Sequence, residues 1–569
     1  MSSTENKGVT AAKEPVMVTI EAGKQVDVRT LKASDHVKAF DPMILVVTIL
    51  ASCFGAIIDL ELMTRVGVSQ NTSIIGALLA VVISMIPGKL FHRFKNIHAQ
   101  NLVQTSISGA AYAAANAMIL PIGIPVLMGR SDLMLPVLFG VTLAAIVDGF
   151  LVYKVFDSPM FAATNPFPSG IATSETILAL ANRGKRSLLL FVGMGAGVAG
   201  KAIGIPMDLF GVSWFGNVIA MMAFAAGSIV KGSLIPMWTA AVSVDGVVPA
   251  MITYLPHGMM VGAGMVSLVQ AALVLGKKSK KSAELAAQDA TGERTVTMES
   301  MHKSLGLGFV LYLGIAILLA FITGIYTDMG VGQLVGWILF AAFAAIASEL
   351  ICGLSAMHAG WFPAMATALI FLMVGIMMGF PPVALGVLVA YTSATGPAFT
   401  DMATDLKCGW ILRGRGANPE FEKAGRKQQF ISELLGYCVA FVMVLLLANT
   451  YFDQGLFVPT TKTFIATIDA GANIEVAKWL LIWAIPGALL QILGGHRQLG
   501  ILFATGLLIG NTRNGLTVLA ALLIRIVAIR WKKQKAQDLL YILGAGCIAG
   551  SALFSFFSST LNLAKVRNK

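Results

Sequence analysis

Residues 92–121 read HRFKNIHAQNLVQTSISGAAYAAANAMILP, a polar segment rich in Asn, Gln and Ser within a chain of mostly apolar runs. In a lipid bilayer each unsatisfied polar group is costly, so amide side chains persist there only where they face a water-filled path or a bound solute. A polar helix among apolar helices therefore indicates transport.

The composition of the whole chain predicts a membrane protein. Of its 569 residues, 56% are hydrophobic and only 12% are charged, and its mean hydropathy is +0.79. Apolar runs of roughly 20 residues, the length that crosses a bilayer as a helix, recur from Pro42 to Phe557. We predict an all-α, polytopic integral membrane bundle of about 14 to 16 transmembrane helices in two halves, with broken or re-entrant segments.

Hydrophilic stretches divide the chain into four parts. Residues 1–41 are polar and lack the features of a signal peptide, so we expect a cytosolic N-terminal segment. Residues 42–276 form the first transmembrane half, 277–303 a cytosolic linker, and 304–569 the second transmembrane half. We expect a multi-pass protein of the cytoplasmic (inner) membrane.

The positive charges lie in short connections between apolar runs. The formal net charge is +12, but connections such as the one that carries Arg413 and Arg426 follow the positive-inside pattern, which excludes a nucleic-acid partner as the reason for the charge. The five cysteines are scattered without a CxxC pair, so we expect neither disulfides nor a metal site. We expect no cofactor.

Three segments predict interrupted helices. They are residues 165–182, 353–367 and 509–515, each with Pro or Gly beside polar residues. Short Pro/Gly-interrupted segments in both halves of a membrane protein indicate the midplane site of a transporter. The alternative is that the prolines only kink packed helices and the small residues allow close approach.

Three motifs carry a resemblance to a known family. They are NLVQTSISGAAYAAANAMILPIGIP (101–125), NPFPSGIATSETILAL (165–180) and TDMATDLKCGWILRGRGANPEFEKAGRKQQFISELLG (400–436). In this order the sequence resembles the oligopeptide transporter (OPT) family, in particular bacterial members close to the yellow stripe-like branch. The resemblance implies a helical transporter of small peptides or peptide-like, metal-chelating amino-acid derivatives, driven by the proton gradient.

The candidate substrate-binding residues are polar, aromatic or small residues of these segments. An aromatic-belt position for Trp361 and hydrogen-bonded packing for His358 are the alternatives. The set is Asn101, Gln104, Asn165, Phe167, Ser169, Gly170, Thr173, His358, Trp361, Asn511 and Arg513. We expect the cavity between residues 165–175 and 353–367, with the Asn101 and Gln104 amides completing its wall.

Intramembrane carboxylates are the candidates for proton coupling. Asp401 and Asp405 are four residues apart, hence on one helix face, where two like charges disfavour joint ionisation. The alternative is that both, with Lys407, cap and neutralise a helix end at a basic loop. Glu175 matches a glutamate of the family motif, and the alternative is that it forms an ion pair with a basic residue at the surface of a helix. Asp148 and Glu349 are near helix ends, where an interfacial position is one explanation.

The sequence therefore predicts a proton-coupled secondary transporter. A channel or facilitator for a small polar solute is the alternative, and it needs no coupling carboxylate. The chain has no GxxxxGK[ST], HExxH or GxSxG motif, so we expect neither ATP hydrolysis nor an enzyme. The expected partners are the solute, protons and the lipid bilayer, and formation of a homo-oligomer stays open.

Overall fold

The computed structural model describes residues 15–21, 23–66, 72–182, 185–243, 248–275, 294–360, 363–471, 474–494, 497 and 499–567. Apart from one small hairpin, the secondary structure of these residues is helical. Among them, nine helices are long and apolar enough to cross a membrane, and six shorter apolar helices accompany them. The prediction of an all-α polytopic membrane protein is confirmed, and the number of crossings stays a prediction.

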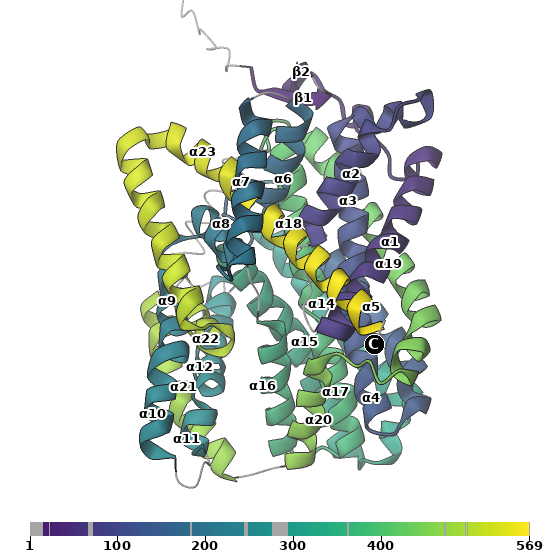
Figure 1. The fold of residues 1–569 in the computed structure, drawn as a ribbon. Coiled ribbons are helices and arrows are strands. Elements are labelled where there is room, and N and C mark those ends of the chain that lie inside the picture. Colours follow the sequence, from purple (N-terminus) through teal and green to yellow (C-terminus); the bar gives the residue numbers. More distant parts are fainter. Residues whose placement is uncertain are drawn as a thin grey trace, which may run out of the picture.

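The helices form two packing groups (Figure 1). The larger group contains α1 (Pro42–Val66), α2 (Thr72–Met85), α3 (Ile97–Tyr112), η4 (Ala113–Ile119), α4 (Leu120–Leu127), α5 (Met134–Val155), α6 (Pro168–Asn182), α14 (Met298–Ile322), α15 (Val331–Ala359), α16 (Ala364–Met377), α17 (Pro382–Ala394), α18 (Pro397–Leu412), α19 (Pro419–Asp453) and α20 (Pro459–Ala470).

The smaller group lies beside it and contains α7 (Lys185–Ala202), α8 (Met207–Phe215), α9 (Val218–Ile229), η6 (Val230–Leu234), α10 (Ile235–Val242), α11 (Ala250–Thr253), α12 (Leu255–Leu275), α21 (Ile474–Gly494), α22 (Leu499–Ile509) and the bent α23 (Thr512–Arg567). Each group thus takes helices from both sides of residues 277–303. The division of the sequence into two halves stays a prediction.

Glycines set the spacing of helices in the smaller group. A Cβ atom on Gly227 of α9 would lie 2.1 Å from the Phe503 carbonyl oxygen of α22, and one on Gly506 of α22 would lie 2.2 Å from the Phe224 carbonyl oxygen of α9. Because both helices present a glycine to the partner's backbone, they approach closely. The small residues of the sequence therefore determine how tightly these apolar helices pack.

The three predicted helix interruptions are present. The described chain is non-helical between α5 and α6, at Gly360 between α15 and α16, and at residues 510–511 between α22 and α23. Residues 353–359 and 168–182 are themselves helical. A fourth interruption, at Thr395 and Gly396, separates α17 from α18. It was not predicted, although Gly396 and Pro397 mark it in the sequence.

The N-terminal segment folds against the α18–α19 connection. Strands β1 (Met17–Glu21) and β2 (Lys24–Asp27) form an antiparallel hairpin, drawn at the top of Figure 1. The Asn418 amide donates to the Val28 carbonyl oxygen at 2.9 Å and to the Leu31 carbonyl oxygen at 2.7 Å. A few residues of the segment predicted to be only polar therefore contribute to the core.

Two of the positive charges at the α18–α19 connection are buried. The Arg413 guanidinium donates from Nε and Nη2 to the Glu422 carboxylate at 2.8 and 3.0 Å, and from Nη1 to Gln429 Oε1 at 2.7 Å. Arg426 is also buried and lies 3.5 Å from Glu422. Both cations are therefore paired with Glu422 rather than solvated, and their effect on membrane topology stays a prediction.

Candidate functional site

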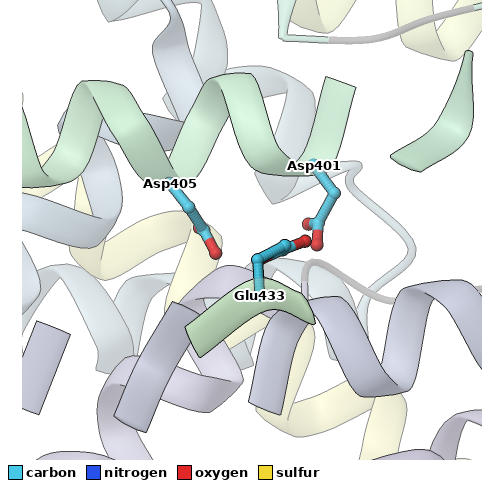
Figure 2. A group of neighbouring side chains, drawn as sticks. All are labelled: Asp401, Asp405 and Glu433. Atoms are coloured by element: carbon cyan, nitrogen blue, oxygen red, sulfur yellow. The ribbon is translucent and has the colours of Figure 1, made fainter. Parts of the chain in front are cut away.

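Three carboxylates meet inside the larger group. Asp401 and Asp405 extend from α18 and Glu433 from α19, and all three side chains are buried. One ligand atom from each lies within 4.8 Å of those of the other two. Figure 2 shows the three side chains in the space between the two helices, with the Glu433 carboxylate turned toward Asp401. We call Asp401, Asp405 and Glu433 the acidic triad.

Polar side chains of α2 and α3 complete one side of the acidic triad. Ser108 donates to Asp401 Oδ1 at 2.8 Å, and the Gln104 amide donates to Asp405 Oδ1 at 2.7 Å. Ser73 lies 3.0 Å from Asp405 Oδ1 and 3.4 Å from Asp401 Oδ1. The polar segment that indicated transport in the sequence therefore faces the predicted coupling carboxylates.

Two oxygens of the acidic triad have no hydrogen-bond donor. Among the described residues these are Oδ2 of Asp401 and Oδ2 of Asp405, whereas the Tyr437 hydroxyl of the same helix acts on the Glu433 carboxylate. Glu433 has room because α3 carries Gly109 opposite it, where a Cβ atom would lie 2.6 Å from Glu433 Oε1. Buried oxygens without donors are costly unless they hold a proton or a cation.

Lys407 does not neutralise the acidic triad. Its ammonium group donates to the carbonyl oxygens of Ala163 at 2.6 Å and Asn165 at 2.9 Å, and it lies 4.5 Å from the ring centroid of Trp410. The described residues contain no ion pair with Asp401 or Asp405. Both carboxylates sit within α18, so the alternative interpretation as a neutralised helix end is wrong.

The segment before α6 lies directly against the end of α15. The Phe167 N–H donates to the Met357 carbonyl oxygen at 2.9 Å, and the Asn165 amide lies 3.1 Å from Met357 Sδ. Phe167 has a φ of 41°, which L side chains rarely adopt, so the turn into α6 is strained. The two segments predicted to flank the cavity are in contact.

Small residues keep these segments close. Gly360, with a φ of 68°, ends α15, and a Cβ atom there would lie 3.1 Å from Pro168. A Cβ atom on Gly170 would lie 2.5 Å from the Thr404 carbonyl oxygen of α18. Helix α18 therefore contacts Gly170 through one side and Gln104 through a neighbouring side.

The other predicted residues occupy different places. Asn101 donates to Gln104 Oε1 at 3.0 Å and so lies beside the acidic triad. Thr173 donates to the Ser169 carbonyl oxygen at 2.9 Å within α6. Glu175 and His358 are buried side chains in α6 and α15. Trp361 lies outside the described residues.

Asn511 and Arg513 are not brought together with the other predicted residues. They line a surface pocket of about 570 Å³ with Lys201 and the α7–α8 turn. The Arg513 guanidinium donates to the Gly204 carbonyl oxygen at 3.1 Å. The flanking glycines of 509–515 mark a helix interruption, but tertiary packing places it in the smaller group.

Sequence reasoning missed Glu433, although the residue lies within the 400–436 motif. It is an isolated carboxylate at the start of a long apolar run of α19, which is the signal that marks functional charges in membrane helices. It also missed the burial of Asp148 and Glu349, whose side chains are fully buried, while their depth in the membrane stays a prediction. The position of a residue along its own helix does not predict whether neighbouring helices bury its side chain.

A family model described as OPT oligopeptide transporter protein matches residues 187–562, which is more than half of the chain. The chain belongs to the oligopeptide transporter family. The matched range of this transporter includes α18 and α19 with the whole acidic triad, and α3 and α6 precede it. No curated protein matches the sequence.

Proposed function

We propose that this transporter is a proton-coupled symporter of small peptides or peptide-like, metal-chelating amino-acid derivatives in the cytoplasmic membrane of a bacterium, within a branch close to the yellow stripe-like members. The observation that carries the proposal is the acidic triad. Three carboxylates whose ligand atoms lie within 4.8 Å of one another in a buried site cannot all be ionised without a cation.

Proton coupling follows from a change in the surroundings of the acidic triad. When the site is closed and dry, bound protons stabilise the acidic triad, in which Oδ2 of Asp401 and Oδ2 of Asp405 have no donor. When water enters from one side, the charged forms are solvated and protons leave. A site whose proton number depends on access from each side couples proton flow to the conformational cycle.

The substrate site lies on the α6 side of α18. Lys407 uses two hydrogen bonds on Ala163 and Asn165, which leaves a third N–H for a substrate carboxylate. The backbone of the interrupted segment next to Ser169 and Gly170 supplies further polar groups. In this arrangement α18 carries the solute contact and the coupling carboxylates on one rigid element.

The test of coupling uses purified protein in proteoliposomes with labelled trialanine and a nickel–histidine chelate as probes. An inward acid gradient should drive accumulation above equilibrium, and a protonophore should abolish it. Asp401→Asn, Asp405→Asn and Glu433→Gln should each lower driven accumulation about tenfold, a loss of about 1.4 kcal/mol, while counterflow exchange persists. Unchanged accumulation in all three variants contradicts the proposed coupling, and simple equilibration without a gradient effect favours the facilitator.

The test of the substrate site fills the space beside the interrupted segment. Ser169→Trp should abolish uptake and binding of the probe that the wild type transports, while the protein stays monodisperse in detergent. Ala196→Trp on the exposed face of α7 is the control and should transport normally. Gly360 is a poor test position, because its positive φ strains any side chain. Binding unchanged in Ser169→Trp would place the solute elsewhere.

A further inference from the structure

A second group of buried acids lies apart from the acidic triad. The Tyr312 hydroxyl of α14 contacts Asp148 Oδ1 of α5 and lies 3.0 Å from Glu349 Oε2 of α15. All three side chains are fully buried. None of the three belongs to the predicted substrate or coupling residues, so the proposed function leaves them without a role.

The hydrogen bonds of this group require that one of the two carboxylates carries a proton, in addition to the hydroxyl hydrogen of Tyr312. A phenol has one hydrogen to donate, so Tyr312 cannot donate to both carboxylates. If it donates to Asp148, then Glu349 approaches the phenol oxygen as the donor and must itself be protonated. The resulting chain runs from the Glu349 carboxylic acid to the Tyr312 oxygen and from the Tyr312 hydroxyl to Asp148.

The surroundings of the two acids decide which one is ionised. Oδ2 of Asp148 accepts from the backbone N–H of Gly396 at 2.7 Å and of Phe399 at 3.4 Å, at the start of α18. These are the free donors of a helix N-terminus, which stabilise an anion. Oε1 of Glu349 has no donor among the described residues. Asp148 is therefore the carboxylate and Glu349 the acid.

Asp148 holds one side of the interruption between α17 and α18. On the α17 side of the interruption, the Ser348 hydroxyl of α15 lies within hydrogen-bond distance of two carbonyl oxygens. It lies 3.4 Å from the Thr392 oxygen and 3.2 Å from the Thr395 oxygen. Gly396 bridges the two helices with a φ of 97°. The negative charge of Asp148 thus fixes the start of α18 at Gly396, and Gly396 precedes Asp401 of the acidic triad by five residues.

We propose that Asp148, Tyr312 and Glu349 form a second proton-binding site that controls the junction of α17 and α18. In the closed state Glu349 holds the proton and Asp148 caps α18. When Glu349 gives its proton to the Tyr312 oxygen, Tyr312 gives its own to Asp148, so the charge moves from Asp148 to Glu349 with no net gain or loss of protons. The neutral Asp148 then holds the α18 N-terminus less strongly, which allows α18 to move with Asp401 and Asp405.

The groups around this second site do not supply a counter-charge. Its titratable neighbours are Cys352 on α15, Tyr391 on α17 and Tyr437 on α19, together with Asp401 further along α18. No basic residue of the described chain is among the groups that act on Asp148 or Glu349. A proton is therefore the species that balances one of the two carboxylates. Only the link to α18 movement rests on the proposed transport function.

The first experiment measures the proton directly by infrared spectroscopy of the purified protein. Glu349→Gln should remove one C=O band of a protonated carboxylic acid, and Tyr312→Phe should shift it, because the acid loses its acceptor. Asp132→Asn, an exposed acid just before α5, is the matched control and should leave the spectrum unchanged. An unchanged band in both Glu349→Gln and Tyr312→Phe overturns the proposal.

The second experiment measures how strongly Asp148 stabilises the start of α18, through the hydrogen–deuterium exchange rate of the backbone amides of residues 395–400. Asp148→Asn should speed exchange there by about tenfold or more, the factor expected when a hydrogen bond to a charged acceptor is lost, and Glu349→Gln should not. Equal exchange in wild type and Asp148→Asn overturns the capping role. Because neither experiment uses a substrate, both can succeed even if the proteoliposome tests show that the proposed symport is wrong.

Discussion

The side-chain amide of Gln104 donates a 2.7 Å hydrogen bond to Oδ1 of Asp405, although the two residues are 301 positions apart. The contact joins the polar α3 to α18 and places an amide against a predicted coupling carboxylate. Gln104 in turn accepts from Asn101, so one short chain of amides ends at the acidic triad. The amides of α3 therefore act directly on the protonation state of a carboxylate of α18.

The first prediction concerns that contact. Gln104→Leu removes the donor and leaves Ser73 as the remaining donor to Asp405 Oδ1, which should lower the stability of the purified protein by about 1–3 kcal/mol. Asn116→Leu in the same membrane span loses only a bond to the Tyr112 carbonyl oxygen and serves as the control. Thermal melting in detergent compares them, and equal melting temperatures would show that the bond contributes little.

The second prediction tests the contact of α6 with α18. Gly170→Ala places a Cβ atom 2.5 Å from the Thr404 carbonyl oxygen, so the helices must separate, and both stability and probe uptake should fall. Gly195→Ala on α7 meets nothing within 4 Å and should be neutral or stabilise by up to about 1 kcal/mol. Melting temperature and uptake are measured together. A Gly170→Ala protein as active and stable as Gly195→Ala would contradict the close approach.

The third prediction concerns the buried ion pair beneath the N-terminal hairpin. Glu422→Gln leaves the Arg413 guanidinium buried without a counter-charge and should destabilise the protein by about 3–5 kcal/mol. Lys423→Gln changes the neighbouring exposed charge and should have an effect near zero. Size-exclusion profiles after heating steps measure the loss of folded protein. If both variants survive the same temperature, the pair does not stabilise the connection.

The fourth prediction is a pH dependence from the N-terminal segment. Burial of the ring, with the nearby Arg413 charge, lowers the pKa of His36 from 6.5 to about 4. Because the unfolded chain takes up this proton at higher pH than the folded chain, the stability contributed by neutral His36 is complete above pH 6.5 and is lost as the pH falls toward 4.

The size of this effect is about 3 kcal/mol by pH 4, at about 1.36 kcal/mol for each unit of pKa difference. His36→Phe keeps a ring beside His98 and Phe421 but cannot be protonated. Its melting temperature should therefore fall less than that of the wild type between pH 7 and pH 4.5. Parallel curves for the two proteins would assign the acid sensitivity to other groups.

Local sequence patterns were enough to predict the class of fold and three of the helix interruptions. Apolar runs of membrane length leave few alternatives to helices, since every backbone group in a bilayer must be satisfied within the segment. The Pro and Gly residues near 165–168, 360–363 and 510 mark where helices stop, because they act on their own neighbours. The break at Gly396 and Pro397 carries the same local signal and was missed; in the structure Ser348 and Asp148, which are distant in sequence, stabilise it.

The sequence by itself determined a polytopic helical protein with carboxylates in pairs and amides in a polar helix, because hydrophobicity and residue spacing act locally. Only the tertiary structure decided that Glu433 joins Asp401 and Asp405, that Lys407 turns away from them, and that Arg513 belongs to a separate pocket. The reason is physical. The environment of a charge is set by the side chains that surround it in space, and in a bundle of packed helices those side chains come from segments hundreds of residues apart.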